Sequence, residues 1–107
     1  MTESERDRHG FDAADYPALR DLFPAYLHQD FAQEYGSAAA AVKGFVSDAS
    51  GDEIVQVREE WKSFRNALRG RPLREIQSAM SALGSAWLPQ NEAQFHEIDE
   101  ILSHAEA

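Results

Sequence analysis

Apolar residues recur three and four positions apart in five successive stretches of the chain, which is the spacing of helices with one buried face. The longest stretch follows Ser50 and has these apolar positions: Ile54, Val57, Trp61, Phe64 and Leu68. No stretch alternates apolar and polar residues as a half-buried strand would. The pattern predicts an all-α fold, a compact single-domain bundle of about five short helices, packed obliquely because their lengths are unequal.

Helix starts are marked by capping residues, whose side chains accept hydrogen bonds from backbone N–H groups of the first turn. Three such positions precede helical stretches: Ser37, Ser50 with Glu53, and Asn91 with Gln94. The spacing of Ser50 and Glu53 is that of a capping box, in which each side chain accepts a hydrogen bond from the other residue's backbone. The caps predict a helix from Ala38 to about Val46, a long helix after Ser50 and a last helix after Asn91.

Glycine and proline mark where helices end. Gly70 and Gly84 each follow a helical stretch, and Gly36 permits a stop just before Ser37. The first stretch begins at Pro17, and Pro24 lies inside it; because proline has no N–H to donate, we expect the helix to kink or restart there. The segment from His28 to Gly36 has no clear period, and we expect it to be partly irregular.

The length of 107 residues, 12.0 kDa, is that of one domain. Residues 1–14 show no periodicity, so we expect a flexible N-terminal leader ahead of a helical domain at residues 15–107, with Phe11 able to pack back onto the core. The chain has no cysteine, which excludes disulfides and Cys-ligated metals. It shows neither a signal-peptide pattern nor an apolar run of membrane length, so we expect a cytoplasmic protein that contacts no membrane.

The formal net charge is −9, and its distribution is uneven. Residues 1–56 hold eleven acids and four Lys or Arg, residues 57–74 hold two acids and six Lys or Arg, and residues 75–107 hold six acids and neither Lys nor Arg. The last third therefore builds a surface of strongly negative potential. Such a surface docks a basic partner or keeps the protein soluble. It repels phosphate backbones, so we expect no direct nucleic-acid binding.

The sequence carries no recognisable catalytic or phosphate-binding motif. His96 and Glu100 lie one turn apart, a spacing that two metal ligands can have, and His28 with Asp30 offers the groups of a general base pair. In both places a solvated polar surface is the commoner explanation. We predict a protein that is not an enzyme and uses no cofactor and no metal; an enzyme with an unrecognised pocket stays open as an alternative.

Four basic residues follow one line along the predicted third helix: Arg58, Lys62, Arg65 and Arg69. A small helical DNA-binding regulator would place such a stripe against phosphates, and this is the alternative function that the sequence leaves open. The other interpretation is that these side chains cover the edge of the core and pair with acids of neighbouring helices. The negative charge of the rest of the chain favours the second interpretation.

Residues 16–37, YPALRDLFPAYLHQDFAQEYGS, resemble the immunity proteins of contact-dependent growth inhibition systems. That family combines an aromatic-rich first helix, an H-Q-D-aromatic element and an acidic, aromatic and Gly-Ser stretch, ahead of a helix that bears Ala and Val. The matching positions are Tyr26, His28, Gln29, Asp30, Phe31, Tyr35, Gly36 and Ser37. We expect their role to be structural, with His28 and Asp30 holding the turn between the first two helices through bonds to backbone groups.

The resemblance implies a protein that binds and neutralises, in a 1:1 complex, the toxic C-terminal domain of a contact-dependent growth inhibition effector. Such toxins are commonly nucleases, including nucleases that cut transfer RNA. A nuclease presents cations to phosphate, so an acidic protein is attracted to the same surface and blocks access of the substrate. The candidate toxin-binding residues are acids off the apolar stripes: Asp30, Glu34, Asp48, Asp52, Glu97, Asp99 and Glu100.

Overall fold

A computed structural model describes residues 12–106, and these residues fold into helices without a strand among them. The elements are η1 (Ala13–Asp15, a 3-10 helix), α2 (Pro17–Tyr26), α3 (Phe31–Tyr35), α4 (Ala38–Asp48), α5 (Gly51–Ala67), α6 (Leu73–Ala82) and α7 (Glu92–Ser103). The predicted all-α class is confirmed. Within the described part of the chain, no helix is both long and apolar enough to cross a bilayer.

Of the expected leader, residues 1–14, only the last three residues are described, and Phe11 lies outside the described residues. Asp12 accepts a hydrogen bond from the backbone N–H of Ala14 and so caps η1. Tyr16, which follows η1, is buried with its ring edge against Phe64. The described structure therefore begins with a turn that is fixed to the core.

The helix that begins at Pro17 and the three helices that follow a predicted cap all start where the sequence places them. Ser37 caps α4, and Ser50 and Glu53 form the complete capping box of α5. At α7 the Asn91 side chain accepts from Gln94 N–H at 2.9 Å, as predicted. The return bond differs, because the Gln94 side chain accepts from the backbone of Gln90, one residue earlier than a capping box requires.

The predicted restart at Pro24 is wrong, because α2 continues through Pro24 to Tyr26. Pro24 stands in the last turn, so the helix loses one hydrogen bond and ends two residues later, with Leu27 N–H still bonded to the Phe23 carbonyl at 2.7 Å. The proline ring instead packs against Gly84. A Cβ on Gly84 would lie 3.2 Å from the ring, and its φ of 95° also favours glycine.

The segment after His28 is also more regular than the sequence predicts, because it contains α3. Phe31 and Tyr35 lie four residues apart, and both are half-buried against the core. One helical turn puts both rings on the same side. A stretch of five residues is too short for periodicity to reveal, which explains the missed helix.

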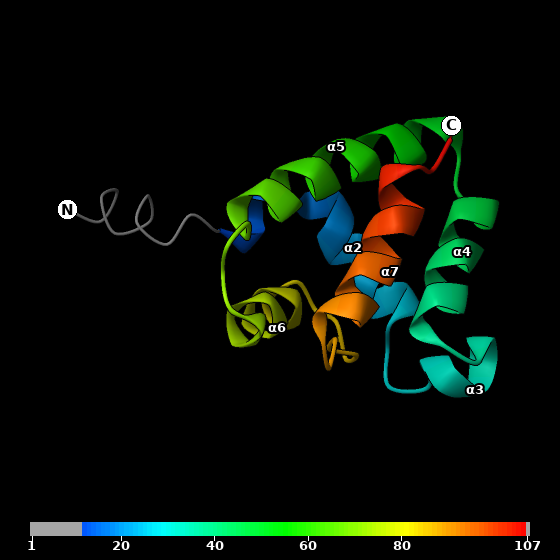
Figure 1. Ribbon diagram of the computed structural model, residues 1–107. Helices are drawn as coiled ribbons and strands as arrows, with labels where there is room; N and C mark the ends of the chain where they lie inside the picture. The colour runs from blue at the N-terminus through cyan, green and yellow to red at the C-terminus, as the bar shows by residue number, and fades with distance from the viewer. Residues whose placement is uncertain (1–11, 107) are drawn as a thin grey trace.

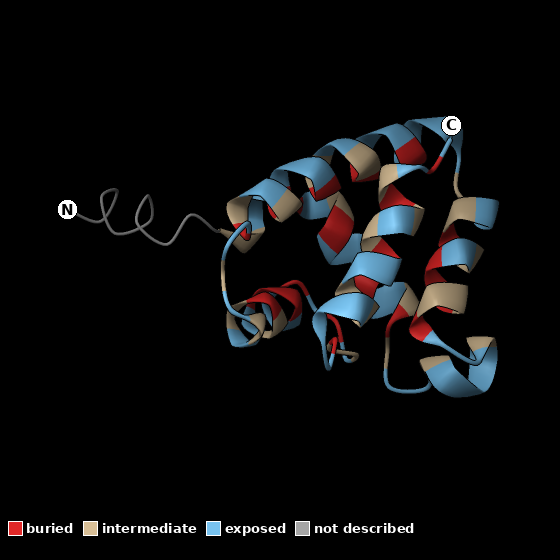
Figure 2. Cartoon of the chain, in the orientation of Figure 1, coloured by how far each residue is buried: buried red, intermediate tan, exposed pale blue. Residues whose placement is uncertain are grey.

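The core is centred on Trp61 of α5, which is fully buried. Its indole lies edge-on to Phe23 of α2, at 6.4 Å between ring centroids, and within 5.5 Å of the rings of Phe64 and Phe95. Figure 2 shows the buried residues on the inward sides of the helices. Burial of these large rings supplies much of the favourable free energy of folding.

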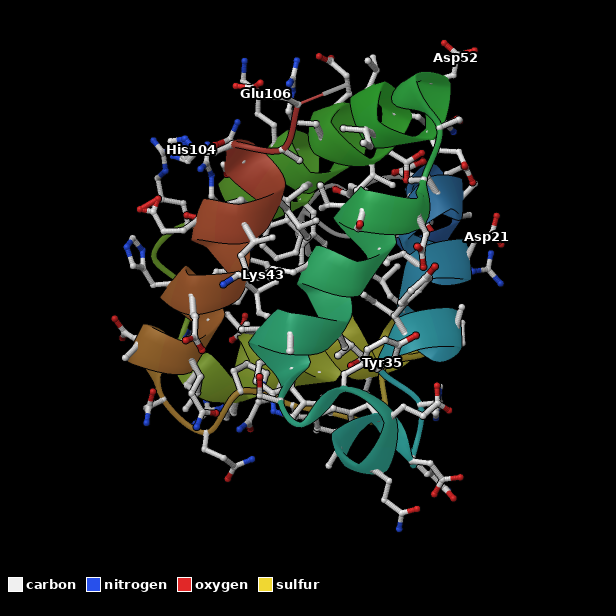
Figure 3. The ribbon with its side chains drawn as sticks, turned by 90° about the vertical axis from the view of Figure 1, so that its right-hand side faces the viewer. Asp21, Tyr35, Lys43, Asp52, His104 and Glu106 are labelled. Atoms are coloured by element: carbon white, nitrogen blue, oxygen red, sulfur yellow. The ribbon has the colours of Figure 1, made fainter. Side chains whose placement is uncertain are left out.

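The helices pack at oblique angles. In Figure 1, α5 lies across the ends of α7 and α4, which run side by side below it. α2 also lies below α5 in this view; it packs against α5 and contacts α4. Figure 3 looks onto α4, with α7 on one side of it and α2 on the other. Two hollows follow from this arrangement, one on each side of α4.

Candidate functional site

His28 organises the turn between α2 and α3. Its Nδ1 accepts a hydrogen bond from the backbone N–H of Asp30 at 3.0 Å, so the proton of the neutral ring lies on Nε2. Nε2 is 3.2 Å from the Glu34 carboxylate on α3. The Asp30 side chain makes no capping bond to α3 and is exposed, as is Gln29. Of the two residues expected to hold the turn, His28 makes the backbone bond.

The other matching positions join α2, α3 and α4 through aromatic contacts. The rings of Tyr26 and Tyr35 lie 6.0 Å apart, and Tyr26 also meets Phe45 of α4 edge-on at 5.6 Å. Gly44 leaves room for Tyr35, because a Cβ there would lie 3.1 Å from the tyrosine ring. Gly36 ends α3 with a φ of 89°. These contacts hold α3 and α4 against α2.

A groove lies between α2, α4 and α5, with a volume of about 330 Å³. We call it the acidic groove, and we define it by Asp21, Tyr26, Phe45, Asp48, Glu53 and Gln56. Its three carboxylates come from α2, from the end of α4 and from the first turn of α5. None of the described residues that line it is Lys or Arg. It therefore combines an apolar interior with a negative rim.

The Tyr26 hydroxyl lies 3.5 Å from the Asp48 carboxylate at the wall of this groove. Burial raises the pKa of Tyr26 above its ordinary value, and the negative charge of Asp48 raises it further. The ring of Tyr35 and the carboxylate of Glu53 act in the same direction. The phenol thus stays protonated, and its neighbours make the groove a place that disfavours an additional negative charge.

The second hollow lies between α4 and α7 and is wider and more open, with a volume of about 710 Å³. Glu97 and Glu100 border it, but Lys43 of α4 lines it too and extends toward α7 in Figure 3. The Glu100 carboxylate is also 3.2 Å from His104 and 3.7 Å from His96. Cationic or protonatable groups therefore offset part of the negative charge on this side.

Asp99 differs from the other candidate acids because it faces inward. Its Oδ1 accepts hydrogen bonds from Trp61 Nε1 at 2.8 Å, from Arg65 at 3.1 Å and from Ser103 at 2.8 Å, and 16% of the side chain is exposed. Burial by itself would raise the pKa of Asp99. The hydrogen bonds from Trp61 and Ser103 and the charge of Arg65 outweigh burial, so the pKa is lowered. Asp99 holds α7 against α5.

The basic stripe of α5 also contributes to this contact. Arg58 donates to the Ala105 carbonyl at 2.7 Å, beyond the end of α7, and Arg65 pairs with Asp99. Arg69 lies past the end of α5, in the turn at residues 68–70, and donates to Asn66 of that helix, whereas Lys62 on α5 is exposed. Arg65 therefore pairs with an acid of a neighbouring helix, as one interpretation of the stripe expects. Two of the four cations stabilise the fold instead of forming an open row for phosphates.

The structure leaves the remaining candidate acids exposed at three places: Asp30 and Glu34 around α3, Asp48 and Asp52 at the junction of α4 and α5, and Glu97 and Glu100 on α7. It adds Asp21 and Glu53, which the sequence analysis did not select. Glu53 is visible in the sequence as a cap. Asp21 gives no such signal, because its proximity to Asp48 depends on how α2 packs on α4.

Within the described residues, no group of three or more His, Cys, Asp or Glu side chains is arranged to hold a metal ion. The described residues form a small all-α protein with an aromatic core and a hollow on each side of α4, one of which is bordered by carboxylates without Lys or Arg. Such a body is suited to docking against another macromolecule.

The family model of the CdiI immunity proteins matches residues 15–97, and the chain therefore belongs to the CdiI immunity protein family. Members of this family neutralise toxins. The resemblance found in residues 16–37 is confirmed, and the match extends it through α6 into α7. No curated protein and no solved structure matches the chain. The acidic groove lies wholly inside the matched residues.

Proposed function

We propose that this immunity protein neutralises a basic nuclease toxin, of which a nuclease that cuts transfer RNA is one kind, by covering the surface that the toxin offers to its substrate. The complex is 1:1, forms in the cytoplasm, and requires no cofactor and no catalysis by the immunity protein. The observation that carries the proposal is the exposure of six candidate acids around α3, α4, α5 and α7 in a protein of net charge −9.

The physical argument is one of competition for the same cations. A nuclease must hold a phosphate backbone, so its substrate channel is lined by Lys and Arg. Exposed carboxylates are attracted to that channel over several ångströms and speed the encounter. Once docked, the inhibitor excludes the substrate by its volume alone. A few well-placed contacts within an interface of roughly 1,200 to 2,000 Å² suffice for tight binding.

Co-expression with the toxin domain encoded immediately upstream tests this proposal. We expect the immunity protein to restore growth and to co-purify with the toxin as a 1:1 complex, measured by light scattering. The purified complex should also lack nuclease activity on transfer RNA. Continued growth arrest and no co-purification, with both proteins folded, would contradict the proposal.

The contribution of α7 can be measured separately. Replacing Glu97 and Glu100 by Ala removes two exposed acids from one helix face. If α7 lies within the interface, the variant should associate more slowly and with a weaker salt dependence. Glu59→Ala, an exposed acid on the outer side of α5, is the control. Unchanged kinetics in the double variant would place the interface away from this part of α7.

A further inference from the structure

We propose that the acidic groove receives an arginine side chain from the basic surface of a protein partner. The inference rests on the function proposed above, in which that partner is the toxin. It adds a location, because it assigns the central charged contact to the side of α4 that faces α2. Three of the seven acids that the sequence selected, Glu97, Asp99 and Glu100, lie instead on α7, on the opposite side of α4.

The shape of the groove suits one long side chain. Its volume of about 330 Å³ is at the small end of the range for ligand pockets, which runs from roughly 300 to 1,000 Å³. Leu22, Phe45 and Val57 line it, and each of these side chains is largely buried. An apolar stem can lie along them while a polar end remains at the rim.

The charge of the groove determines which charge the polar end of the bound side chain carries. Asp21, Asp48 and Glu53 border it from three different elements, without a Lys or Arg among the described lining residues. A cation seated there gains from several carboxylates in a partly desolvated setting, where charge pairs are stronger than in water. The hollow between α4 and α7 is less favourable for a cation, because Lys43 and His96 line it.

The hydrogen-bond acceptors favour arginine over lysine. Besides the carboxylates, the groove offers the Tyr26 hydroxyl oxygen and the side-chain oxygen of Gln56, whose amide nitrogen already donates to Glu60. A guanidinium has five donors, whereas an ammonium has three. The guanidinium is also more weakly hydrated, so it loses less on leaving water for a groove with an apolar interior.

The proposed function makes this arginine part of a protein, because an immunity protein of this family binds a toxin protein. Val55, the exposed large apolar side chain of the described residues, lies two residues from both Glu53 and Val57 and therefore on a different side of α5 from the groove. The argument for the occupant thus rests on the charge and the apolar interior of the groove.

The test compares two variants that change the net charge equally. Asp21→Asn with Asp48→Asn removes two charges from the groove with little change in shape and keeps Glu53, which the capping box requires. We expect this variant to raise the Kd for the toxin domain at least about tenfold and to weaken its salt dependence. Glu59→Gln with Glu106→Gln is the control; neither residue lines the groove, and binding should change less than about threefold.

A second variant tests the volume of the groove without changing the charge. Ala25→Trp places a bulky ring on the α2 wall, where Ala25 is exposed and lines the groove. We expect it to fold with an unchanged circular dichroism spectrum and to lose toxin affinity at least about tenfold. Wild-type affinity in this variant and in the groove charge variant would overturn the inference while the proposed function stands. Equal weakening by the control pair would also overturn it.

The identity of the side chain is tested by double-mutant cycles. Asp48→Asn is combined in turn with replacement of each surface arginine of the toxin by Lys, and one arginine should show a coupling of about fivefold or more. Coupling only to toxin lysines replaced by Ala would overturn the assignment of arginine. A toxin that does not bind the wild-type protein at all would overturn the proposed function and this inference together.

Discussion

Asp99 contributes to the fold from a position that resembles, in sequence, the other acids of the last helix. Its carboxylate accepts hydrogen bonds from three side chains, two on α5 and one on its own helix. Trp61 is among the donors, so the central ring of the core depends on this carboxylate for its only polar partner that the structure records. Glu97, two residues earlier, is exposed.

Asp99→Ala should lower the free energy of unfolding by about 2 to 4 kcal/mol, because it leaves the Trp61 indole N–H and the Arg65 guanidinium without their partner. Urea unfolding followed by tryptophan fluorescence measures the change. Glu97→Ala is the control on the same helix and should have little effect. Equal unfolding midpoints for the two variants would show that the Asp99 contacts contribute nothing.

The lowered pKa of Asp99 also predicts how stability depends on pH. The unfolded chain takes up a proton on this group at a higher pH than the folded protein does, near the ordinary Asp value of about 3.9. The stabilisation is therefore complete above that value and is lost as the pH falls through the folded-state pKa. Stability measured between pH 6 and pH 2 should decline less steeply in Asp99→Asn than in the wild type. Parallel curves would contradict the prediction.

The residue-level prediction from sequence succeeded where the partner is close along the chain. The His28 bond to the backbone of Asp30 and the Ser50–Glu53 box span two and three residues. The placement of Asp99 off the apolar stripe is wrong, although a signal was available. Asp99 follows Phe95 by four residues and precedes Leu102 by three, so it lies on the same side of α7 as those apolar residues.

At the scale of elements, one helix caps another. The N-cap position of α2, Tyr16, offers no side-chain acceptor to the first turn. Glu60 of α5 supplies it, because its Oε1 accepts from the backbone N–H groups of Ala18 at 2.8 Å and Leu19 at 3.1 Å. A carboxylate there also interacts favourably with the positive end of the helix dipole. The contact joins residues more than forty positions apart, which no local pattern in the sequence can reveal.

Glu60→Ala should destabilise the protein by about 1 kcal/mol, the usual cost of losing an N-cap. Thermal unfolding monitored by circular dichroism measures the shift in Tm. The neighbouring residue gives a matched control, because Glu59→Ala removes the same charge from the outer side of α5. If both variants lower the Tm equally, the effect comes from the charge and not from the cap.

The helices themselves were predictable to the extent that their signals are local. The caps and apolar stripes give α4, α5 and α7 their starts, whereas α3 and the continuation of α2 through Pro24 depend on tertiary packing. The acidic groove was not predictable as a unit. Asp48 was selected as a candidate from sequence, but its proximity to Asp21 arises only when α2, α4 and α5 meet.

At the scale of the whole molecule, negative charge surrounds an apolar core, and among residues 12–106 few ion pairs join different helices. Arg65 with Asp99 is such a pair, whereas Arg71 with Glu75 links residues four apart. Exposed acids on different helices therefore repel one another in the free protein. A basic partner relieves this repulsion when it docks, which adds to the attraction between the two surfaces.

This distribution predicts how toxin binding depends on ionic strength. Raising the NaCl concentration from about 50 mM to 500 mM should slow association by at least about tenfold, because salt screens the attraction between the surfaces beyond a few ångströms. The dissociation rate should change less, since it depends on contacts inside the interface. Surface plasmon resonance at graded salt measures both rates. An association rate that is insensitive to salt would contradict an acidic docking surface.

The two oxygens of Glu60 act in different places, since one caps α2 and the other accepts from Gln56 in the wall of the acidic groove. Gln56 is thereby held by the same carboxylate that caps α2 in the folded protein. Gln56 therefore has less conformational freedom left to lose when a partner arrives, which lowers its share of the entropic cost of association. In the proposed complex, discrimination between toxins would then depend on how well each one places its cation against Gln56 and the carboxylates of the groove.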